Sequence, residues 1–336
     1  MSKPVILSGM QPTGDGKLHL GNLEGALKNL VSMQDDYQIY LCIVDWHALT
    51  ADYDKTQGLK KRILEEAMDY LSSGLDPEKC AIFVQSLVKE HAELHLLLSM
   101  ITPLEWLRRV PSYKEKKDEL GLDSYGFLGY PLLQAADILI YKAEFVPVGK
   151  DQIPHIEVTR EIARKFNLIY GNVFPEPQAK LSKYPTILGT DGRKMSKSYG
   201  NDITIADSQE ITAQKVSKMY TDPKKIHKKD AGHPDKCPVF LLHKIYTPQM
   251  DTERVHTDCI SGKWGCVECK KKLIENMNEA LAPIRKKRRE LEKNIDYVEN
   301  VLYSGSDKAR VRAQETMKEV RGAMGMMESK IHRDGR

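Results

Sequence analysis

Cysteines and long apolar runs are scarce in this sequence. Its 336 residues include six cysteines, too few for a disulfide-stapled scaffold. The most apolar region, residues 131–148, is interrupted by Gln134, Asp137, Lys142 and Glu144, which excludes a membrane-spanning helix there. The first residues contain neither a long apolar segment nor a small-residue cleavage site, so we expect no signal peptide. We therefore expect a cytoplasmic protein with reduced thiols and no membrane association.

A strong excess of charge of one sign is also missing. Lysine and arginine number 51 against 47 acidic residues, which gives a formal net charge of +4. Residues 1–200 sum to −2 (24 basic, 26 acidic) and residues 201–336 to +6 (27 basic, 21 acidic). The second half is therefore the better candidate for contact with a polyanion. Solvated helix faces explain the same excess equally well, and +6 is too small for a dedicated DNA-binding tail.

The first half of the chain alternates apolar runs with helical patterns. Short apolar runs at 5–10, 39–44 and 80–84 predict strands buried on both faces. Between them, apolar residues repeat at helical spacing over 23–31 and 59–71. This order predicts an α/β fold with a Rossmann-like, doubly wound parallel sheet. In such sheets the loops at the carboxyl ends of the strands bind ligands.

The second half is dominated by helical patterns. Residues 211–219, 271–294 and 309–327 are typical of charged helices, and a stretch with prolines and cysteines fills 221–269. A chain of this length is expected to form about two domains. We predict an α/β domain over 1–195 and an all-helical C-terminal domain over 196–336.

A glycine-rich loop over residues 9–22 follows the first predicted strand and precedes a helix. Free backbone N–H groups and the helix dipole at such a junction both favour anions, so the loop can hold a phosphate. His19 can donate to a phosphate oxygen, and Gly21 lets a flat ring such as adenine approach the backbone. The segment matches neither the Walker pattern nor Gly-x-Gly-x-x-Gly. Taken alone, it is as well explained by a structural turn.

A second loop, residues 189–200, carries Lys194, Ser196, Lys197 and Ser198 between glycines. Two lysines three residues apart can neutralise charge that develops on a polyphosphate. A basic surface loop is the alternative for an isolated cluster of this kind. Together the two loops are far more specific, since His-x-Gly-Asn followed by Lys-Met-Ser-Lys-Ser resembles the signature pair of class I aminoacyl-tRNA synthetases. In that family the pair binds ATP and stabilises the pentavalent α-phosphate.

Four further segments, 11–14, 45–50, 130–141 and 146–152, resemble bacterial-type tryptophanyl-tRNA synthetases in the family's order. The resemblance implies ATP with Mg²⁺, L-tryptophan and tRNA(Trp) as ligands, a homodimer, and a catalytic domain that ends at the second loop. It implies catalytic roles for His19, Lys194 and Lys197. The implied ATP-binding residues are Gln11, Pro12, Thr13, His19, Gly21, Asn22, Gly149, Lys150, Asp151, Lys194, Met195, Ser196, Lys197 and Ser198. The implied tryptophan-binding residues are Leu7, Gly9, His47, Tyr130, Gln134, Asp137, Val146, Val148 and Gln152.

Asp137 also makes chemical sense as a reader of tryptophan. It lies in an otherwise apolar helical pattern, where a carboxylate needs a partner. An indole offers one N–H donor and no acceptor, so a carboxylate suits it. A pair with a nearby cation such as Lys142 is the alternative. The spacing of Tyr130, Gln134 and Asp137 also resembles the tyrosine-binding helix of the sister enzymes, which leaves tyrosine as a second candidate substrate. Asp15 and Gly16 look like an insertion relative to the family's loop.

Four cysteines in the second half, Cys237, Cys259, Cys266 and Cys269, form the pattern Cys-x21-Cys-x6-Cys-x2-Cys. Zinc and a 4Fe–4S cluster both accept four thiolates, and unrelated buried thiols are the alternative. A subset of tryptophanyl-tRNA synthetases carries an iron–sulfur cluster in this region, so the resemblance implies 4Fe–4S, with Zn²⁺ as the alternative. The same resemblance places the tRNA anticodon against this domain.

Overall fold

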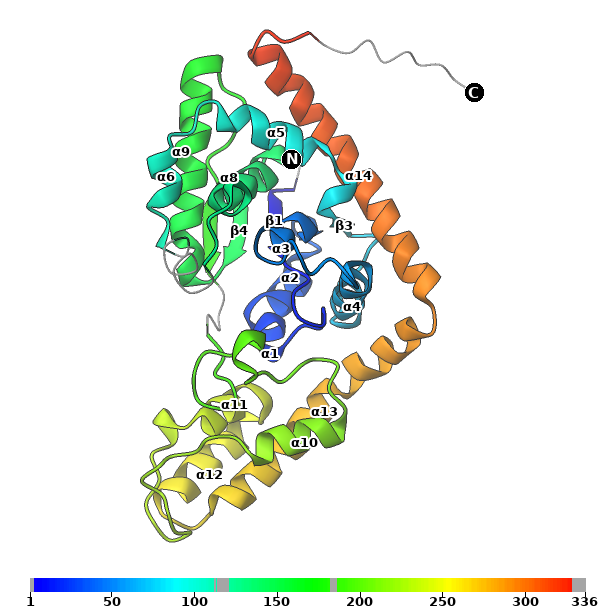
Figure 1. The fold of residues 1–336 in the computed structure, drawn as a ribbon. Helices are drawn as coiled ribbons and strands as arrows, with labels where there is room; N and C mark the ends of the chain where they lie inside the picture. Colours follow the sequence, from blue (N-terminus) through cyan, green and yellow to red (C-terminus); the bar gives the residue numbers. More distant parts are fainter. Residues whose placement is uncertain (1–2, 112, 114–120, 182–185, 328–336) are drawn as a thin grey trace.

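The computed structural model describes residues 3–111, 113, 121–181 and 186–327, and Figure 1 shows their arrangement. A five-stranded parallel sheet has the order β3-β2-β1-β4-β5. The strands are β1 Val5–Met10, β2 Gln38–Ile43, β3 Cys80–Val84, β4 Phe145–Val148 and β5 Gln178–Leu181. The predicted doubly wound parallel sheet is confirmed, and the three predicted strands lie within one residue of their expected bounds.

The helices that precede or flank the sheet strands are α1 Leu20–Asn22, the π-helix η1 Leu23–Leu27, α2 Lys28–Met33, α3 Asp45–Ala51, α4 Leu59–Ser72, α5 Glu90–Ser99, α6 Leu104–Arg108, α8 Tyr125–Ile140 and α9 Ile153–Tyr170. The later helices are α10 Gln209–Ser217, α11 Pro238–Tyr246, α12 Gln249–Ile260, α13 Cys266–Glu292 and α14 Ile295–Ala323. Short helical turns are η2 Gln85–Leu87, η3 Lys150–Gln152, η4 Lys197–Tyr199 and η5 Pro234–Lys236. The three predicted charged helices correspond to α10, α13 and α14.

Alternate side chains of the central strands fill two separate cores, one on each face of the sheet. Ile39 and Leu41 of β2 point into one core, whereas Tyr40 and Cys42 point into the other. This is the expected consequence of the two-residue period of a strand whose two faces are both covered by helices. None of the helices within the described residues combines the length and the apolar character that a bilayer crossing requires.

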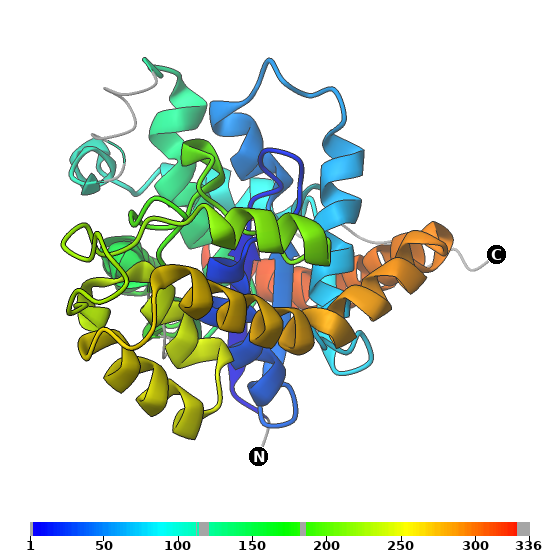
Figure 2. The same cartoon turned by 90° about the horizontal axis from the view of Figure 1, so that it is seen from below.

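The C-terminal helices continue both cores. In Figure 1, α10 to α13 form the lower part of the molecule, while α14 runs along its side past β3. Figure 2, seen from below, shows α13 crossing the molecule toward α14. Leu281 of α13 and Val298 of α14 belong to one core, and Ala309 and Met317 of α14 to the other. The hydrophobic interior is therefore continuous across residue 195, and the two-domain division there remains a prediction.

Helix α14 approaches β3 so closely that only glycine fits at one position. A Cβ atom added to Gly305 would lie 1.9 Å from the carbonyl oxygen of Ile82, which is backbone and cannot rotate away. We expect Gly305→Ala to lower the free energy of unfolding by about 1–3 kcal/mol or more, because the helix must shift off the strand. Chemical denaturation of the variant measures this.

A matched control lies in the same helix. A Cβ on Gly322 would meet no atom within 4 Å, so Gly322→Ala should leave stability unchanged or raise it by up to about 1 kcal/mol through helix propensity. Equal stability of the two variants would contradict the close packing of α14 on β3.

Candidate functional site

A cavity of about 970 Å³ opens at the carboxyl ends of β1 and β4. In the strand order, the chain leaves β1 toward β2 on one side, whereas β4 pairs with β1 on the other. This is the point of the sheet where neighbouring connections run to opposite sides, and ligands of doubly wound folds bind there. The position follows from the topology and agrees with the prediction that the loops after the strands form the site.

Most of the residues singled out in the sequence line this one cavity. The nine predicted tryptophan-binding residues all do: Leu7, Gly9, His47, Tyr130, Gln134, Asp137, Val146, Val148 and Gln152. The predicted nucleotide-binding residues that line it are Gln11, His19, Gly21, Asn22, Gly149, Asp151, Lys194, Met195 and Ser196. Pro12, Thr13, Lys150, Lys197 and Ser198 are not part of its lining. The two predicted sets thus occupy a continuous space rather than two separate sites.

His19 stands at the start of α1, immediately beside the cavity. The Asn22 side-chain oxygen accepts a hydrogen bond from the His19 backbone N–H at 3.1 Å, which fixes the first turn of the helix. A Cβ on Gly21 would lie 2.8 Å from the His19 ring, so glycine here makes room for the imidazole itself. Burial and, to a smaller extent, the charges of Lys197 and Lys194 lower the pKa of His19 to about 4. At neutral pH the ring is uncharged and can donate one N–H.

A short antiparallel backbone pairing joins the two loops. The Leu20 N–H donates to the Ile203 carbonyl at 2.9 Å, and the Ile205 N–H donates to the Leu18 carbonyl at 2.8 Å. The side chains of these four residues are buried. Residues 203–205 come directly after the lysine-rich loop, so this pairing fixes that loop relative to His19.

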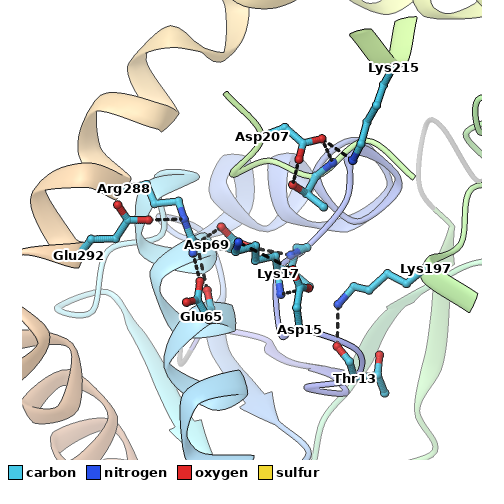
Figure 3. Close-up of polar contacts among 12 residues, drawn as sticks. Thr13, Asp15, Lys17, Glu65, Asp69, Lys197, Asp207, Lys215, Arg288 and Glu292 are labelled. Carbon is cyan, nitrogen blue, oxygen red and sulfur yellow. Dashed lines mark hydrogen bonds and ion pairs between the residues drawn. The ribbon is translucent and has the colours of Figure 1, made fainter. Parts of the chain in front are cut away.

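The two lysines of the second loop occupy different places. The Lys194 ammonium lies 3.5 Å from the Asp151 carboxylate at the cavity, and both side chains are more than half exposed. The Lys197 ammonium instead donates to the Thr13 carbonyl at 2.9 Å, as Figure 3 shows. Burial lowers its pKa, which Glu66 opposes through its charge. Lys197 thus rests behind the glycine-rich loop rather than in the cavity.

The apparent insertion, Asp15 and Gly16, forms a turn that packs against α4. The Gly16 N–H donates to the Thr13 carbonyl at 3.0 Å, and a Cβ on Gly16 would clash with the backbone of Arg62. The Arg62 guanidinium in turn donates to the Pro12 carbonyl at 3.0 Å. The extra residues therefore extend away from the cavity toward α4 and do not enter its lining.

Asp137, on α8, is almost fully buried and has three donors. Its carboxylate accepts from His91 Nδ1 at 2.6 Å, from Gln85 Nε2 at 2.8 Å, and from His47 Nε2 at 2.9 Å. Burial would raise the pKa of Asp137, but His91 and His47 hold it well below its usual range. The carboxylate is therefore ionised and held in a fixed orientation at the cavity wall.

The alternative pairing of Asp137 with Lys142 is wrong. The Lys142 ammonium lies 2.6 Å from Glu319 of α14, because Lys142 follows the end of α8 and points away from the cavity. This pair joins the first half of the chain to the last helix.

Sequence reasoning missed Gln85, His91 and Tyr141. His91 has no exposed surface, and its Nε2 is hydrogen-bonded to the Tyr141 hydroxyl at 2.7 Å, which holds the ring with Nδ1 toward Asp137. Gln85 directly follows β3. A polar residue at the carboxyl end of a buried strand is the one signal that could have found it.

The four cysteines of the second half line a separate, small cavity of about 20 Å³ in the lower part of the molecule. Cys237 precedes α11, Cys259 lies in α12, and Cys266 and Cys269 lie in the first turn of α13. Trp264 and Phe240 contribute to the apolar wall. Burial, together with the neighbouring Cys237, Cys259 and Cys266, raises the pKa of Cys269 to about 12. Within the described residues, no three His, Cys, Asp or Glu side chains converge as they would around a single ion.

Known proteins resemble this chain over almost its whole length. A family model described as tRNA synthetases class I (W and Y) matches residues 1–282. The Tryptophan--tRNA ligases of Thermotoga maritima and Aquifex aeolicus are 51% and 45% identical, each over 96% of this chain and 99% of the relative. A solved tryptophanyl-tRNA synthetase from Campylobacter jejuni, complexed with ADP and tryptophan, matches with a TM-score of 0.86 at 37% identity, covering 96% of this chain and 100% of that chain. The chain therefore belongs to the tryptophanyl-tRNA synthetases, a family of class I tRNA synthetases.

Proposed function

We propose that this chain is an ATP-dependent tryptophan--tRNA ligase. The tryptophan carboxylate attacks the α-phosphorus of ATP, the bond to the β-phosphate breaks, and pyrophosphate leaves. A ribose hydroxyl at the end of tRNA(Trp) then attacks the carbonyl of the adenylate and releases AMP. The observation that carries this proposal is the single cavity with an ionised Asp137 in its wall and both His19 and Lys194 in its lining.

The tryptophan end of the cavity is defined by Asp137. We propose that its carboxylate accepts the indole N–H, while Val146, Val148, Leu7 and Gly9 wall the ring. Tyr130 and Gln152 would orient the α-amino group, and His47 and Gln134 complete the lining. A buried acceptor of this kind rejects phenylalanine, which has no donor to offer it. The names of the relatives favour tryptophan over tyrosine as the substrate.

The nucleotide end is proposed to use positioning and charge rather than a general base. Gly149 to Asp151 would contact the ribose, and the neutral His19 would donate to a phosphate oxygen. Lys194 can reach a phosphate from its present place, whereas Lys197 must first leave the Thr13 carbonyl. Bound Mg²⁺ would supply further neutralisation of the phosphate charge. These groups act where negative charge develops in the transition state.

Two assays test this function together. The wild-type protein should exchange pyrophosphate into ATP only with tryptophan present, and should charge a tRNA(Trp) transcript. Asp137→Asn should lower kcat/KM for tryptophan about 10²-fold, because its amide N–H₂ would face the donors of His91, His47 and Gln85. Selectivity over phenylalanine should fall with it.

An exposed aspartate provides the control. Asp36→Asn, far from the α8 carboxylate in the loop before β2, should behave as the wild type. Unchanged selectivity in Asp137→Asn would remove Asp137 from the substrate site, whereas exchange without charging would point to a nucleotidyltransferase with another acceptor.

We also propose that Cys237, Cys259, Cys266 and Cys269 hold a 4Fe–4S cluster. All four line one cavity, and Lys225 contributes a positive charge to the same wall. In such a cluster each thiolate binds a different iron, so the sulfurs need not converge on one point as they do around zinc. The walls must move apart to admit it, since about 20 Å³ holds little more than one water.

Metal analysis of anaerobically purified protein distinguishes the possibilities. Broad visible absorption with about four irons per chain is the expected result. Cys266→Ser should lose the iron, and Cys80→Ser should keep it, because Cys80 is buried in β3 on the far side of the molecule. Colourless protein with one zinc would replace the cluster by Zn²⁺, and iron-free, zinc-free protein that also fails reconstitution would reduce the four residues to ordinary thiols.

The remaining proposals concern partners. We propose that residues 196–336 form the domain that meets the tRNA anticodon, with residues 1–195 as the catalytic domain, and that the protein acts in the cytoplasm. We further propose a homodimer. Leu96 and Met100 at the end of α5, Leu104 of α6 and Tyr125 of α8 are each more than half exposed, which leaves an apolar surface for a second copy.

Light scattering tests the dimer. We expect a mass of twice 38.2 kDa for the wild type. Met100→Glu should shift the protein toward the monomer, whereas Met250→Glu, at a still more exposed methionine on α12, should not. A wild-type monomer at micromolar concentration would exclude this interface.

A further inference from the structure

Asp69, on α4, joins two parts of the molecule that are far apart in sequence. One carboxylate oxygen accepts from the backbone N–H of Leu18 at 2.6 Å, and the other forms an ion pair with Arg288 of α13. Asp69 has no exposed surface and Arg288 is only 2% exposed. Figure 3 shows the Arg288 guanidinium between Asp69, Glu65 and Glu292. This carboxylate therefore contacts both the residue next to His19 and helix α13.

This ion pair lies in the interior of the protein, where each charge depends on its partner. A buried carboxylate without a counter-charge is strongly destabilising, so Asp69 depends on Arg288 to remain ionised. An ionised acceptor also makes a stronger hydrogen bond with a backbone N–H than a neutral one. Arg288 therefore strengthens the hold of Asp69 on the Leu18 backbone, although it does not touch that residue itself.

A second contact joins the helical turn after this loop to the C-terminal helices. The Tyr246 hydroxyl of α11 donates to Glu24 of η1 at 2.8 Å, and Glu24 is also buried. Helix α13 itself begins with Cys266 and Cys269 and ends beyond Arg288, a span of about 40 Å at 1.5 Å per residue. The glycine-rich loop and the helical turns after it are thus connected to α13, through Asp69, and to α11.

We infer that Asp69 and Arg288 are positioning residues for the activation of tryptophan by ATP. They set the position of the backbone at Leu18 and His19, and they make that position depend on where α13 lies. This inference rests on the proposed function, because it takes His19 to be a phosphate-binding group. Asp69 and Arg288 touch no substrate; they act through the backbone of the loop. Displacement of α13, for example when RNA binds the C-terminal helices, changes the position of His19.

The ionisation of Asp69 gives this role a measurable signature. Burial raises the pKa of Asp69 to about 7, and Arg288 is the strongest influence against that rise. The other charged groups that face it are Glu65 and Glu66 on its own helix and Lys197 from the second loop. Without Arg288 the carboxyl is protonated at neutral pH. Its hydrogen bond to the Leu18 N–H weakens, and activation requires a higher pH.

The experiment is tryptophan-dependent pyrophosphate exchange without tRNA, using the full chain. Arg288→Gln should raise KM for ATP or lower kcat at least 10-fold with KM for tryptophan unchanged, and should move the acidic limb of the pH profile to higher pH. Arg288→Lys keeps the charge but loses the two-pronged geometry, and should show about a 3-fold effect.

The matched control is Arg285→Gln. Arg285 is a buried arginine on the same helix, but it bonds to Asn278 and Thr212 within the C-terminal part. Its loss should lower the melting temperature without changing KM for ATP or the pH profile. Wild-type protein without exchange would refute the proposed function itself. Normal exchange by the wild type, with Arg288→Gln equal to Arg285→Gln in KM and pH profile, would overturn the positioning role. If Arg288→Gln does not fold, wild-type values for Arg288→Lys would overturn it as well.

Discussion

The short backbone pairing between Leu18–Leu20 and Ile203–Ile205 is the constraint on which the rest of the site depends. Two hydrogen bonds, buried among apolar side chains, fix the start of α1 against the strand-like segment that follows the second loop. Each such bond contributes only about 1 kcal/mol net, but breaking one inside the protein leaves a buried polar group unsatisfied. The pairing therefore behaves as a rigid joint. His19 and the loop that carries Lys194 take their relative positions from it.

Two buried carboxylates on opposite sides of the sheet show how the choice of partner decides the behaviour of a charge. Asp137 is surrounded by two imidazoles and an amide, and its pKa stays low. Asp69 has a guanidinium and a backbone N–H, but its burial raises its pKa to about 7, and the charge of Glu65 on the same helix acts in the same direction. The first can be a constant acceptor at the substrate wall. The second changes its charge within the physiological range, so it suits a conditional role rather than recognition.

The sequence was sufficient for the parts of the fold in which the apolar pattern is uninterrupted. Strands β1, β2 and β3 are largely apolar, and their observed bounds lie within one residue of the predicted ones. Strand β4 contains Pro147, and β5 is a polar, largely exposed edge strand, so neither has the composition of a buried strand. Helices α11 and α12 were not predicted within the stretch 221–269. Each has a proline in or just before its first turn, and these prolines gave the stretch the composition of a loop.

In the site, motif resemblance found the lining of the cavity but not the contacts behind it. Gln85 and His91 lie 52 and 46 residues from Asp137 in the chain, and no local spacing connects them. The sequence also could not predict where the Lys197 side chain points. Whether this flexible side chain lies in the cavity or bonds to the Thr13 carbonyl depends on the three-dimensional arrangement of the two loops. Local sequence patterns predict helices and strands, whereas side-chain contacts between residues distant in sequence can be identified only from the folded structure.

The close packing of α14 on β3 has a consequence for how the protein is made. The backbone N–H of Val84 donates to the Ser306 hydroxyl across a separation of 222 residues. At a synthesis rate of roughly 5–20 residues per second, α14 leaves the ribosome about 10–45 s after β3. Until then β3 lacks the helix that covers it. During that time an apolar strand edge is open to other nascent chains. The sheet is therefore protected at this edge only after α14 has been synthesised.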